Sequence, residues 1–330
     1  LTLPLKVAPW LSVALSAGGR GTWWGESVPV TRVDPVTLLP TRVCDSGEVA
    51  AGEQYCGETL TRTVGSGAVQ VVGPSFSRIF DVSGKRFGKL KHVVEPRFEY
   101  VYASDFDDQN RVARFDEIDA ATAANSVRAA LVNRVLAKPA SDELGAAFEI
   151  LSFELAQLYS LDDEKPLQRS SDGQLTKKEG PILAQLRFSP ARVFDLQARA
   201  SWSTLFDSLN STSLSMRGKG KRVGLDLTWY TDYNAQTGEQ RSDQARVGLD
   251  LQIVPQRLSL TAQVNYDLKD AELLQHRYFL NYRSQCWSVL VEYREQLTTR
   301  FETQDYRFML SLKNVGTFLD LNGGDRSDRY

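Results

Sequence analysis

The sequence predicts an all-β protein, an antiparallel transmembrane β-barrel of about fifteen strands by counting segments and links. Three observations favour this fold class. Apolar and polar residues alternate with period two over segments of about ten residues, which is typical of strands with one apolar face. The links between these segments are alternately short and long, as at the two rims of an outer-membrane barrel. No run approaches the roughly 18 to 20 apolar residues of a membrane helix.

The composition argues against a nucleic-acid-binding protein and against a disordered one. The 330 residues include 39 Lys and Arg against 41 Asp and Glu, a net charge of −2. This balance argues against a nucleic-acid partner, which would favour a basic excess. With 42 % hydrophobic and 24 % charged residues the chain is not disordered in composition. It begins LTLPLKVAPW, without an initiator Met or signal peptide, so we expect a removed leader or a fragment of a longer protein.

The clearest strands lie after residue 181. In segment 258–268 every second residue from Leu258 to Leu268 is apolar, and the residues between them are polar. In a membrane barrel the apolar face meets lipid and the polar face meets water. We therefore expect the polar residues to face the lumen, among them Asp195, Arg199, Asp226, Arg246, Asp250, Gln263, Asn265 and Arg294.

The links between the strands in this half are alternately short and long. Short links are expected at 189–191, 218–220, 255–256 and 284–285, and longer polar ones at 204–210, 233–242, 269–273 and 297–303. A soluble β-sandwich has no reason to keep two unequal rims, so the links favour a barrel. The last strand is expected near 304–314.

The first half is less regular. Its candidate strands are 3–16, 20–30, 57–81, 86–103, 123–137 and 142–160. Short links are expected at 17–19, 82–85 and 138–141, and long ones at 31–56, 104–122 and 161–179. Segment 142–160 also carries a helical stripe from Leu144 to Leu158, and its own residues leave helix and strand open.

Aromatic residues gather near the strand ends, as in the interfacial girdles of membrane barrels. They are Trp229, Tyr230, Tyr233, Tyr266, Tyr278, Tyr282, Trp287 and Tyr293. Aromatic residues are also common in strands of any kind, so this signal is not specific.

The sequence offers little enzyme chemistry. His92 and His276 lack Asp, Glu or Cys neighbours at metal-ligand spacing, and no G-x-S-x-G, P-loop or G-x-G-x-x-G motif joins a strand to a helix. Sequence order leaves open a Ser–His arrangement like that of an outer-membrane lipase. We expect no enzyme, no catalytic residue, no metal site and no cofactor.

Several stretches resemble the family of LptD, the outer-membrane lipopolysaccharide-assembly protein also called organic solvent tolerance protein OstA. The resemblance runs in order from about residue 88 to 320 in short motifs. They are HVVEPRFEYVY (92–102), ARFDEIDAATAANSVRAALVNRV (113–135), FELAQLYSL (153–161), CWSVLVEYRE (286–295) and DYRFMLSLKNVGTF (305–318). The resemblance implies that 142–160 is a strand.

The resemblance also implies a function. Members of this family form a large barrel in the outer membrane of Gram-negative cells and insert lipopolysaccharide (LPS) into the outer leaflet. An LptE-like lipoprotein plug and an LptA-like periplasmic bridge would be partners, together with outer-membrane lipids. Residues 1–330 would be the C-terminal portion of the barrel domain, without the N-terminal periplasmic jellyroll and the first strands.

The cysteines fit an oxidising compartment. Cys44 and Cys56 both lie in the long link 31–56, which the alternation places outside, so we expect them to pair. The family has a Cys-Cys pair before an aromatic residue, which forms disulfides to the periplasmic domain. Here Gln285 takes the first position, so Cys286 would form a single bridge to the missing N-terminal region.

In the family, the seam that closes the barrel is thought to let lipid leave sideways. We expect Tyr306, Phe308, Leu310 and Leu312 of the last strand to border that seam. The alternative is that they are ordinary lipid-facing residues.

Two other functions stay open. A passive diffusion porin, or another outer-membrane transport barrel, would share the fold, and the mixed charges of the lumen residues do not decide between it and LPS transport. A soluble or secreted β-repeat protein would also alternate polar and apolar residues, and it would need no detergent for extraction.

Overall fold

The computed structural model describes residues 1–33, 40–44, 47–49, 54–82, 84, 86–113, 123–140, 146–297 and 301–328. Parts of several predicted segments lie outside these residues: the links 31–56, 82–85, 104–122, 138–141 and 297–303, and the start of strand 142–160.

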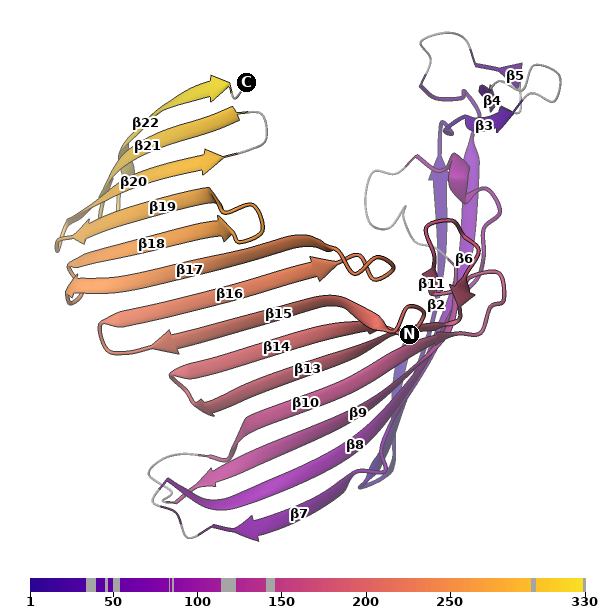
Figure 1. Cartoon of the computed structure of the whole chain (residues 1–330), viewed down its shortest axis with the longest axis horizontal. Helices are drawn as coiled ribbons and strands as arrows, with labels where there is room; N and C mark the ends of the chain where they lie inside the picture. Colours follow the sequence, from indigo (N-terminus) through magenta and orange to yellow (C-terminus); the bar gives the residue numbers. More distant parts are fainter. Residues whose placement is uncertain are drawn as a thin grey trace. The chain divides into compact units, whose positions relative to one another are not determined.

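The chain is all-β, as predicted (Figure 1). Seventeen strands belong to one antiparallel sheet, and a two-stranded and a three-stranded sheet accompany it. Among the described residues, helical structure is limited to the short 3-10 turn η1 (Gln109–Arg111). No helix in that part of the chain is long and apolar enough to cross a membrane.

The main sheet contains ten strands from the second half of the chain and seven from the first. They are β1 (Thr2–Ala8), β2 (Leu11–Trp24), β6 (Leu60–Val72), β7 (Phe76–Asp81), β8 (Phe87–Ala103), β9 (Ala124–Pro139), β10 (Phe148–Ser160), β13 (Glu179–Ala191), β14 (Phe194–Ser203), β15 (Ser208–Lys219), β16 (Val223–Tyr233), β17 (Gln240–Val254), β18 (Leu258–Asp267), β19 (Glu272–Arg283), β20 (Trp287–Leu297), β21 (Phe301–Leu312) and β22 (Gly316–Asp328).

The chain divides into two compact units. Unit 1 consists of residues 1–75, 95–129 and 158–167, and unit 2 of residues 76–94, 130–157 and 168–330. Strands β8, β9 and β10 contribute residues to both units.

Unit 1 is built on the strand β2. It pairs with β1 on one side and with β6 on the other, where the register runs from Ser12 opposite Val72 to Trp24 opposite Leu60. At the end of this ladder Trp24, Leu60 and Val112 form a small buried core with Phe106 packed against it. The three-stranded sheet of β3 (Val30–Val33), β4 (Pro40–Cys44) and β5 (Gly47–Glu48) also belongs to this unit.

Unit 2 contains a meander in which each strand from β13 to β22 pairs with the next one in sequence. Links of two or three residues, at 192–193, 220–222, 255–257, 284–286 and 313–315, join the strands at one end. The links 204–207, 234–239 and 268–271 join them at the other end and are only slightly longer. The alternation in length is therefore weaker than predicted. A two-stranded sheet of β11 (Gln168–Arg169) and β12 (Thr176–Lys177) precedes the meander.

Several boundaries in the first half of the chain differ from the prediction. The predicted strand 3–16 is a hairpin that turns at residues 9–10, and the predicted link 17–19 lies inside β2. Gly18 and Gly19 of the predicted link stand in the ladder opposite Ser66 and Gly65. The predicted strand 57–81 is interrupted between β6 and β7 at Gly73, which approaches the carbonyl of Trp10 so closely that a Cβ would lie 2.2 Å from it.

The last strand was also misplaced. The predicted strand 304–314 corresponds to β21, and β22 follows it and pairs with it. Segment 142–160 contains the strand β10. The family resemblance implied a strand here, and this prediction is confirmed. The helix that the spacing of the apolar residues also allowed does not form in the described part of the segment.

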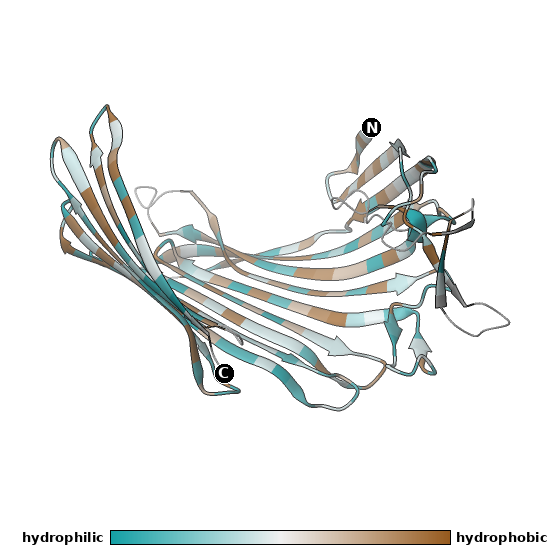
Figure 2. Cartoon of the chain, turned by 90° about the horizontal axis from the view of Figure 1, so that it is seen from above, coloured by the Kyte–Doolittle hydropathy of each residue, from teal (hydrophilic) through white to brown (hydrophobic). Residues whose placement is uncertain are grey.

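The two faces of the sheet differ in polarity. Brown and teal residues alternate along many of the strands in Figure 2. Apolar side chains on one face of unit 2 remain exposed instead of forming a core: Val223 is 46 %, Val291 42 % and Tyr306 54 % accessible. Exposed apolar side chains of this kind are typical of a surface that contacts a membrane or another protein.

Candidate functional site: the charged face of the sheet

The other face of strands β13–β22 carries most of the charged residues, and we call it the charged face. Residues directly opposite each other in an antiparallel pair share a face. The register links one row across the meander: Asp195, Arg217, Asp226, Gly248, Gln263, Arg277, Arg294, Asp305 and Gly324.

The eight residues predicted to be lumen-facing all lie on this face. Asp195, Asp226, Gln263 and Arg294 belong to the row itself. The other four, Arg199, Arg246, Asp250 and Asn265, lie two or four residues along a strand from a member of the row, and such residues share its face. The alternation of polar and apolar residues therefore predicted correctly that these eight residues share one face. That this surface borders a lumen remains a prediction.

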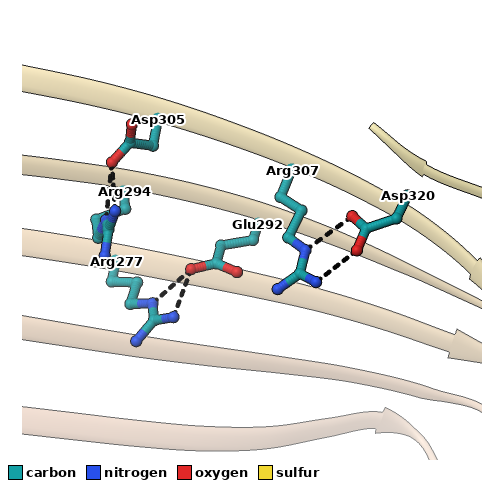
Figure 3. Close-up of polar contacts among 6 residues, drawn as sticks. All are labelled: Arg277, Glu292, Arg294, Asp305, Arg307 and Asp320. Atoms are coloured by element: carbon teal, nitrogen blue, oxygen red, sulfur yellow. Dashed lines mark hydrogen bonds and ion pairs between the residues drawn. The ribbon is translucent and has the colours of Figure 1, made fainter. Parts of the chain in front are cut away.

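Ion pairs connect neighbouring strands on the charged face (Figure 3). The guanidinium Nη2 of Arg277 lies 2.5 Å from Oε1 of Glu292, and that of Arg294 lies 2.5 Å from Oδ2 of Asp305. Arg307 binds both carboxylate oxygens of Asp320, at 2.9 and 2.6 Å. Each bond joins one strand to the next, so the pairs form a series over β19–β22.

These pairs differ in exposure. The side chains of Arg217 and Asp226, which are 2.5 Å apart, are 75 % and 43 % accessible. An ion pair this exposed contributes only about 0 to 1 kcal/mol. Glu292 is buried, and the guanidinium of Arg277 lies 4.4 Å from the centroid of the Phe279 ring. The pair Arg277–Glu292 is therefore the one in which loss of the carboxylate costs most.

A hollow of about 670 Å³ lies beside these pairs and is lined by residues of β19–β22. Gly324 forms part of its wall opposite Asp305. A Cβ at Gly324 would lie 2.6 Å from the carbonyl oxygen of Gln304 and 2.7 Å from Oδ1 of Asp305. Only glycine lets β22 approach the carboxylate that binds Arg294.

Amide and hydroxyl groups continue the polar surface over β17–β19. Arg246 Nε donates to Oδ1 of Asn265 at 2.8 Å, and Nδ2 of Asn265 donates to Oε1 of Gln275 at 3.1 Å. The hydroxyl of Thr261 donates to Oδ1 of Asp250 at 2.6 Å. The charged face thus offers hydrogen-bond donors and acceptors and charges of both signs, and this suits transient hydrogen bonding to a hydrated, hydroxyl-rich molecule.

Over the residues that the structure describes, no group of three or more His, Cys, Asp and Glu side chains could hold a metal ion.

The four residues predicted to border a seam lie on the apolar face of β21. The prediction placed them on the last strand, and that is wrong. Tyr306, Phe308 and Leu310 stand opposite residues of β20 on one side and of β22 on the other, and so does Leu312. A strand that is paired along both edges cannot form an open seam.

Aromatic residues cluster on the apolar face of β19–β21. Tyr278 and Tyr293 stack with ring centroids 6.4 Å apart, and Tyr306 lies 5.0 Å from Tyr293. Nε2 of His276, one of the two histidines, is 3.3 Å from Oε2 of Glu295 in the same group. Tyr230 departs from the predicted girdle, since it stands opposite Ser213 and Gln244 on the charged face.

Two of the three cysteines form a disulfide, and the third is a free thiol. Cys44 and Cys56 form a disulfide, as predicted, and it ties β4 to the segment before β6. Cys56 also exchanges two backbone hydrogen bonds with Ser27, at 2.7 and 3.1 Å. Cys286 is a free, exposed thiol in the link before β20.

Arg217 and Asp320 belong to the charged face and were not among the predicted residues. Arg217 follows Ser211, Ser213 and Ser215 at period two in β15, so the alternation alone could have identified it. Asp320 belongs to β22, which was not predicted as a strand, so no pattern assigned it to a face.

The comparisons with known proteins identify one family. The model of LPS transport system D, LptD, matches residues 50–253. No curated protein sequence matches the chain significantly.

Among solved structures, a double mutant of Rhodopseudomonas blastica porin is 10 % identical, covering 96 % of this chain and 100 % of that chain at a TM-score of 0.33. A chain from a complex of FpvAI with pyocin S2 is 9 % identical, covering 99 % of this chain and 54 % of that chain at a TM-score of 0.30. Scores this low carry no inference. The family model spans more than half of the chain, and the chain belongs to the LptD family, LPS transport system D.

Proposed function

We propose that this chain forms part of the wall of an outer-membrane β-barrel of a Gram-negative cell and helps to insert LPS into the outer leaflet. Membership of the LptD family is the observation that carries the proposal. The two faces of the sheet support it, because each has the chemistry that one side of such a wall needs.

The apolar face supports contact with lipid. Its side chains are exposed, and the core residues of the described chain are few and lie elsewhere, mainly in β6–β10 and the loops beside them. Strands such as β14 and β18 contain 10 residues, close to the roughly 9 to 11 that a tilted strand needs to cross a bilayer. Lipid would supply the apolar contacts that the chain itself does not.

The charged face supports a hydrated path. Three of its arginines, Arg277, Arg294 and Arg307, are paired with carboxylates, so neither sign of charge dominates over β19–β22. An LPS molecule carries sugars with many hydroxyl groups, and these can exchange hydrogen bonds with amides, carboxylates and guanidinium groups as they move. A surface with a large charge excess would instead retain an oppositely charged molecule.

Partners follow from the same proposal. An LptE-like lipoprotein plug would occupy the lumen, and an LptA-like periplasmic bridge would deliver LPS through an N-terminal jellyroll that precedes this barrel portion.

Cys286 would form a disulfide with a cysteine of that N-terminal region, since its thiol is free and exposed within this chain. In the oxidised full-length protein, Cys286→Ser should change the electrophoretic mobility under non-reducing conditions. Unchanged mobility would remove this role from Cys286.

Photo-crosslinking tests the function. A photoreactive amino acid at Gln263 on the charged face should capture LPS in cells that produce the full-length protein. The matched control is Val264, the next residue of β18, which lies on the apolar face. Equal capture of LPS at both positions, or none at Gln263, would contradict the proposal.

A further inference from the structure

The two ends of the meander in unit 2 carry opposite charges. The five short links and the residue on each side of each link, all of which the structure describes, contain seven lysine and arginine side chains and no carboxylate. At the other end, the links 204–207, 234–239 and 268–271 with their flanking residues contain five carboxylates and one lysine. We call the end with the short links the basic end.

Two further hollows adjoin each other at the basic end. The larger, of about 430 Å³, is lined by Lys219, Lys221 and Arg222, and the smaller, of about 120 Å³, by Arg257 and Arg283. Gln252 and Ser259 line both of them. Five of the seven cations are therefore gathered around one stretch of surface over β15–β19.

A glycine leaves the space of the larger hollow open. Gly224 of β16 stands between Lys219 of β15 and Asp250 of β17 in the ladder, so the three residues share a face. A Cβ at Gly224 would lie 3.4 Å from the Cβ of Asp250. A larger side chain at this position would fill the space between Lys219 and Asp250.

The positive charge of this surface is in excess and within reach of a ligand. The five cations are exposed, and their side chains have no hydrogen bond or ion pair with any residue that the structure describes. The larger hollow also contains Arg217, which binds Asp226, and Asp250, which accepts a hydrogen bond from Thr261. The lining of the two hollows therefore contains six cationic side chains against two carboxylates.

The chemistry of the lining favours a sugar that carries phosphate. Guanidinium and ammonium groups bind phosphate through charged hydrogen bonds, and the amides and hydroxyls of Gln252, Ser259 and Asn281 can bind sugar hydroxyls. Lys219 and Arg283 stand opposite Gly224 and Ser288 on the charged face. That face is the water side in the function proposed above, so its position favours a hydrated ligand over the headgroup of a membrane lipid.

We propose that the basic end of the charged face binds the phosphate groups of a phosphorylated sugar, with Lys219, Lys221 and Arg222 around one hollow and Arg257 and Arg283 around the other. The proposal rests on the function proposed above for the source of the ligand, which would be a phosphorylated sugar of LPS. The excess of positive charge draws phosphate groups to this end of the charged face, whose arginines further along the strands are paired.

Binding of soluble sugars tests the site apart from LPS transport. The probes are glucose, glucose 6-phosphate and glucose 1,6-bisphosphate, titrated by calorimetry at physiological salt against the full-length protein in an uncharged detergent. Glucose 6-phosphate should bind about tenfold or more tightly than glucose, and the bisphosphate more tightly again, because charged hydrogen bonds are the strong ones. Affinities that do not rise with the number of phosphate groups would overturn the proposal.

Two double variants locate the binding. Arg222→Gln with Arg283→Gln removes one arginine from each hollow and should abolish most of the difference between the phosphorylated sugars and glucose. Both side chains are exposed, so the fold is at little risk.

The matched control is Arg192→Gln with Lys313→Gln. It removes two cations of the same end that line neither hollow, and the difference should stay within about twofold because salt screens distant charges. Equal losses in the two double variants, or no loss from Arg222→Gln with Arg283→Gln, would overturn the proposal. Gln263 lines neither hollow, so capture of LPS there fails or succeeds independently of phosphate binding.

Discussion

On the charged face of unit 2, Arg277, Arg294 and Arg307 form ion pairs of 2.5, 2.5 and 2.6 Å with carboxylates of the next strand. In unit 1, Arg62 is buried, and its guanidinium lies 5.0 Å from the centroid of the Trp24 ring and donates a hydrogen bond to Oε1 of Gln109. The same residue type therefore serves two purposes. A paired arginine adds polarity without net charge, and this suits a surface over which a molecule moves. A buried arginine beside an aromatic ring instead connects β6 to the 3-10 turn η1, which contains Gln109.

The largest effect is expected from an arginine on the wrong face. Ala262→Arg places a cation at the middle of the apolar face of β18, and it should lower the free energy of unfolding by about 2 to 4 kcal/mol. Gln263→Arg, one residue further, should lower it by less than about 1 kcal/mol, because the charged face already solvates arginine. Urea unfolding of the full-length protein in lipid bilayers measures both. Equal losses would show that the two faces do not have different surroundings.

A smaller effect is expected from breaking the most buried pair. Glu292→Gln leaves the guanidinium of Arg277 beside a neutral amide and should cost about 2 kcal/mol. Asp226→Asn is the matched control, because the pair Arg217–Asp226 is exposed and should cost at most about 1 kcal/mol. The same unfolding assay compares them. If both substitutions cost the same, exposure does not govern the strength of these pairs.

The smallest effect is expected at the hollow beside β22. Gly324→Ala introduces a Cβ into contact with the Gln304 carbonyl, and we expect a cost of about 1 kcal/mol as β22 shifts away from β21. Gly323→Ala is the control, because a Cβ there meets nothing within 4 Å. Thermal unfolding of the two variants provides the comparison. A larger loss from Gly323→Ala would contradict the close approach at Gly324.

The sequence pattern predicted the charged face well because strand geometry alone determines it. Once 258–268 is a strand, alternate residues such as Gln263 and Asn265 must share a face. Boundaries failed where glycine took part in a ladder, as at Gly18 and Gly19, because glycine is read as a turn residue unless the partner strand is known. Strand β22 was missed for the same reason, since its central residues Asn322, Gly323 and Gly324 resemble a turn.

The contacts between the strands and loops of unit 1 were beyond prediction from sequence. Arg62 and Gln109 are 47 residues apart, and Asp105 and Lys165 are 60 apart. Nothing periodic connects these positions, because loops and not strands bring them together. Only the packing of Trp24, Leu60 and Val112 beneath the loop shows where the residues meet.

The central claim is that one face of unit 2 meets lipid and the other meets water. Spin labels placed one at a time from Leu260 to Asn265 of β18, in the full-length protein in bilayers, test it most directly. Collision with oxygen should be high at Leu260, Ala262 and Val264, and collision with a water-soluble nickel reagent should be high at Thr261, Gln263 and Asn265. An accessibility pattern without period two, or one with the two faces exchanged, would contradict the claim.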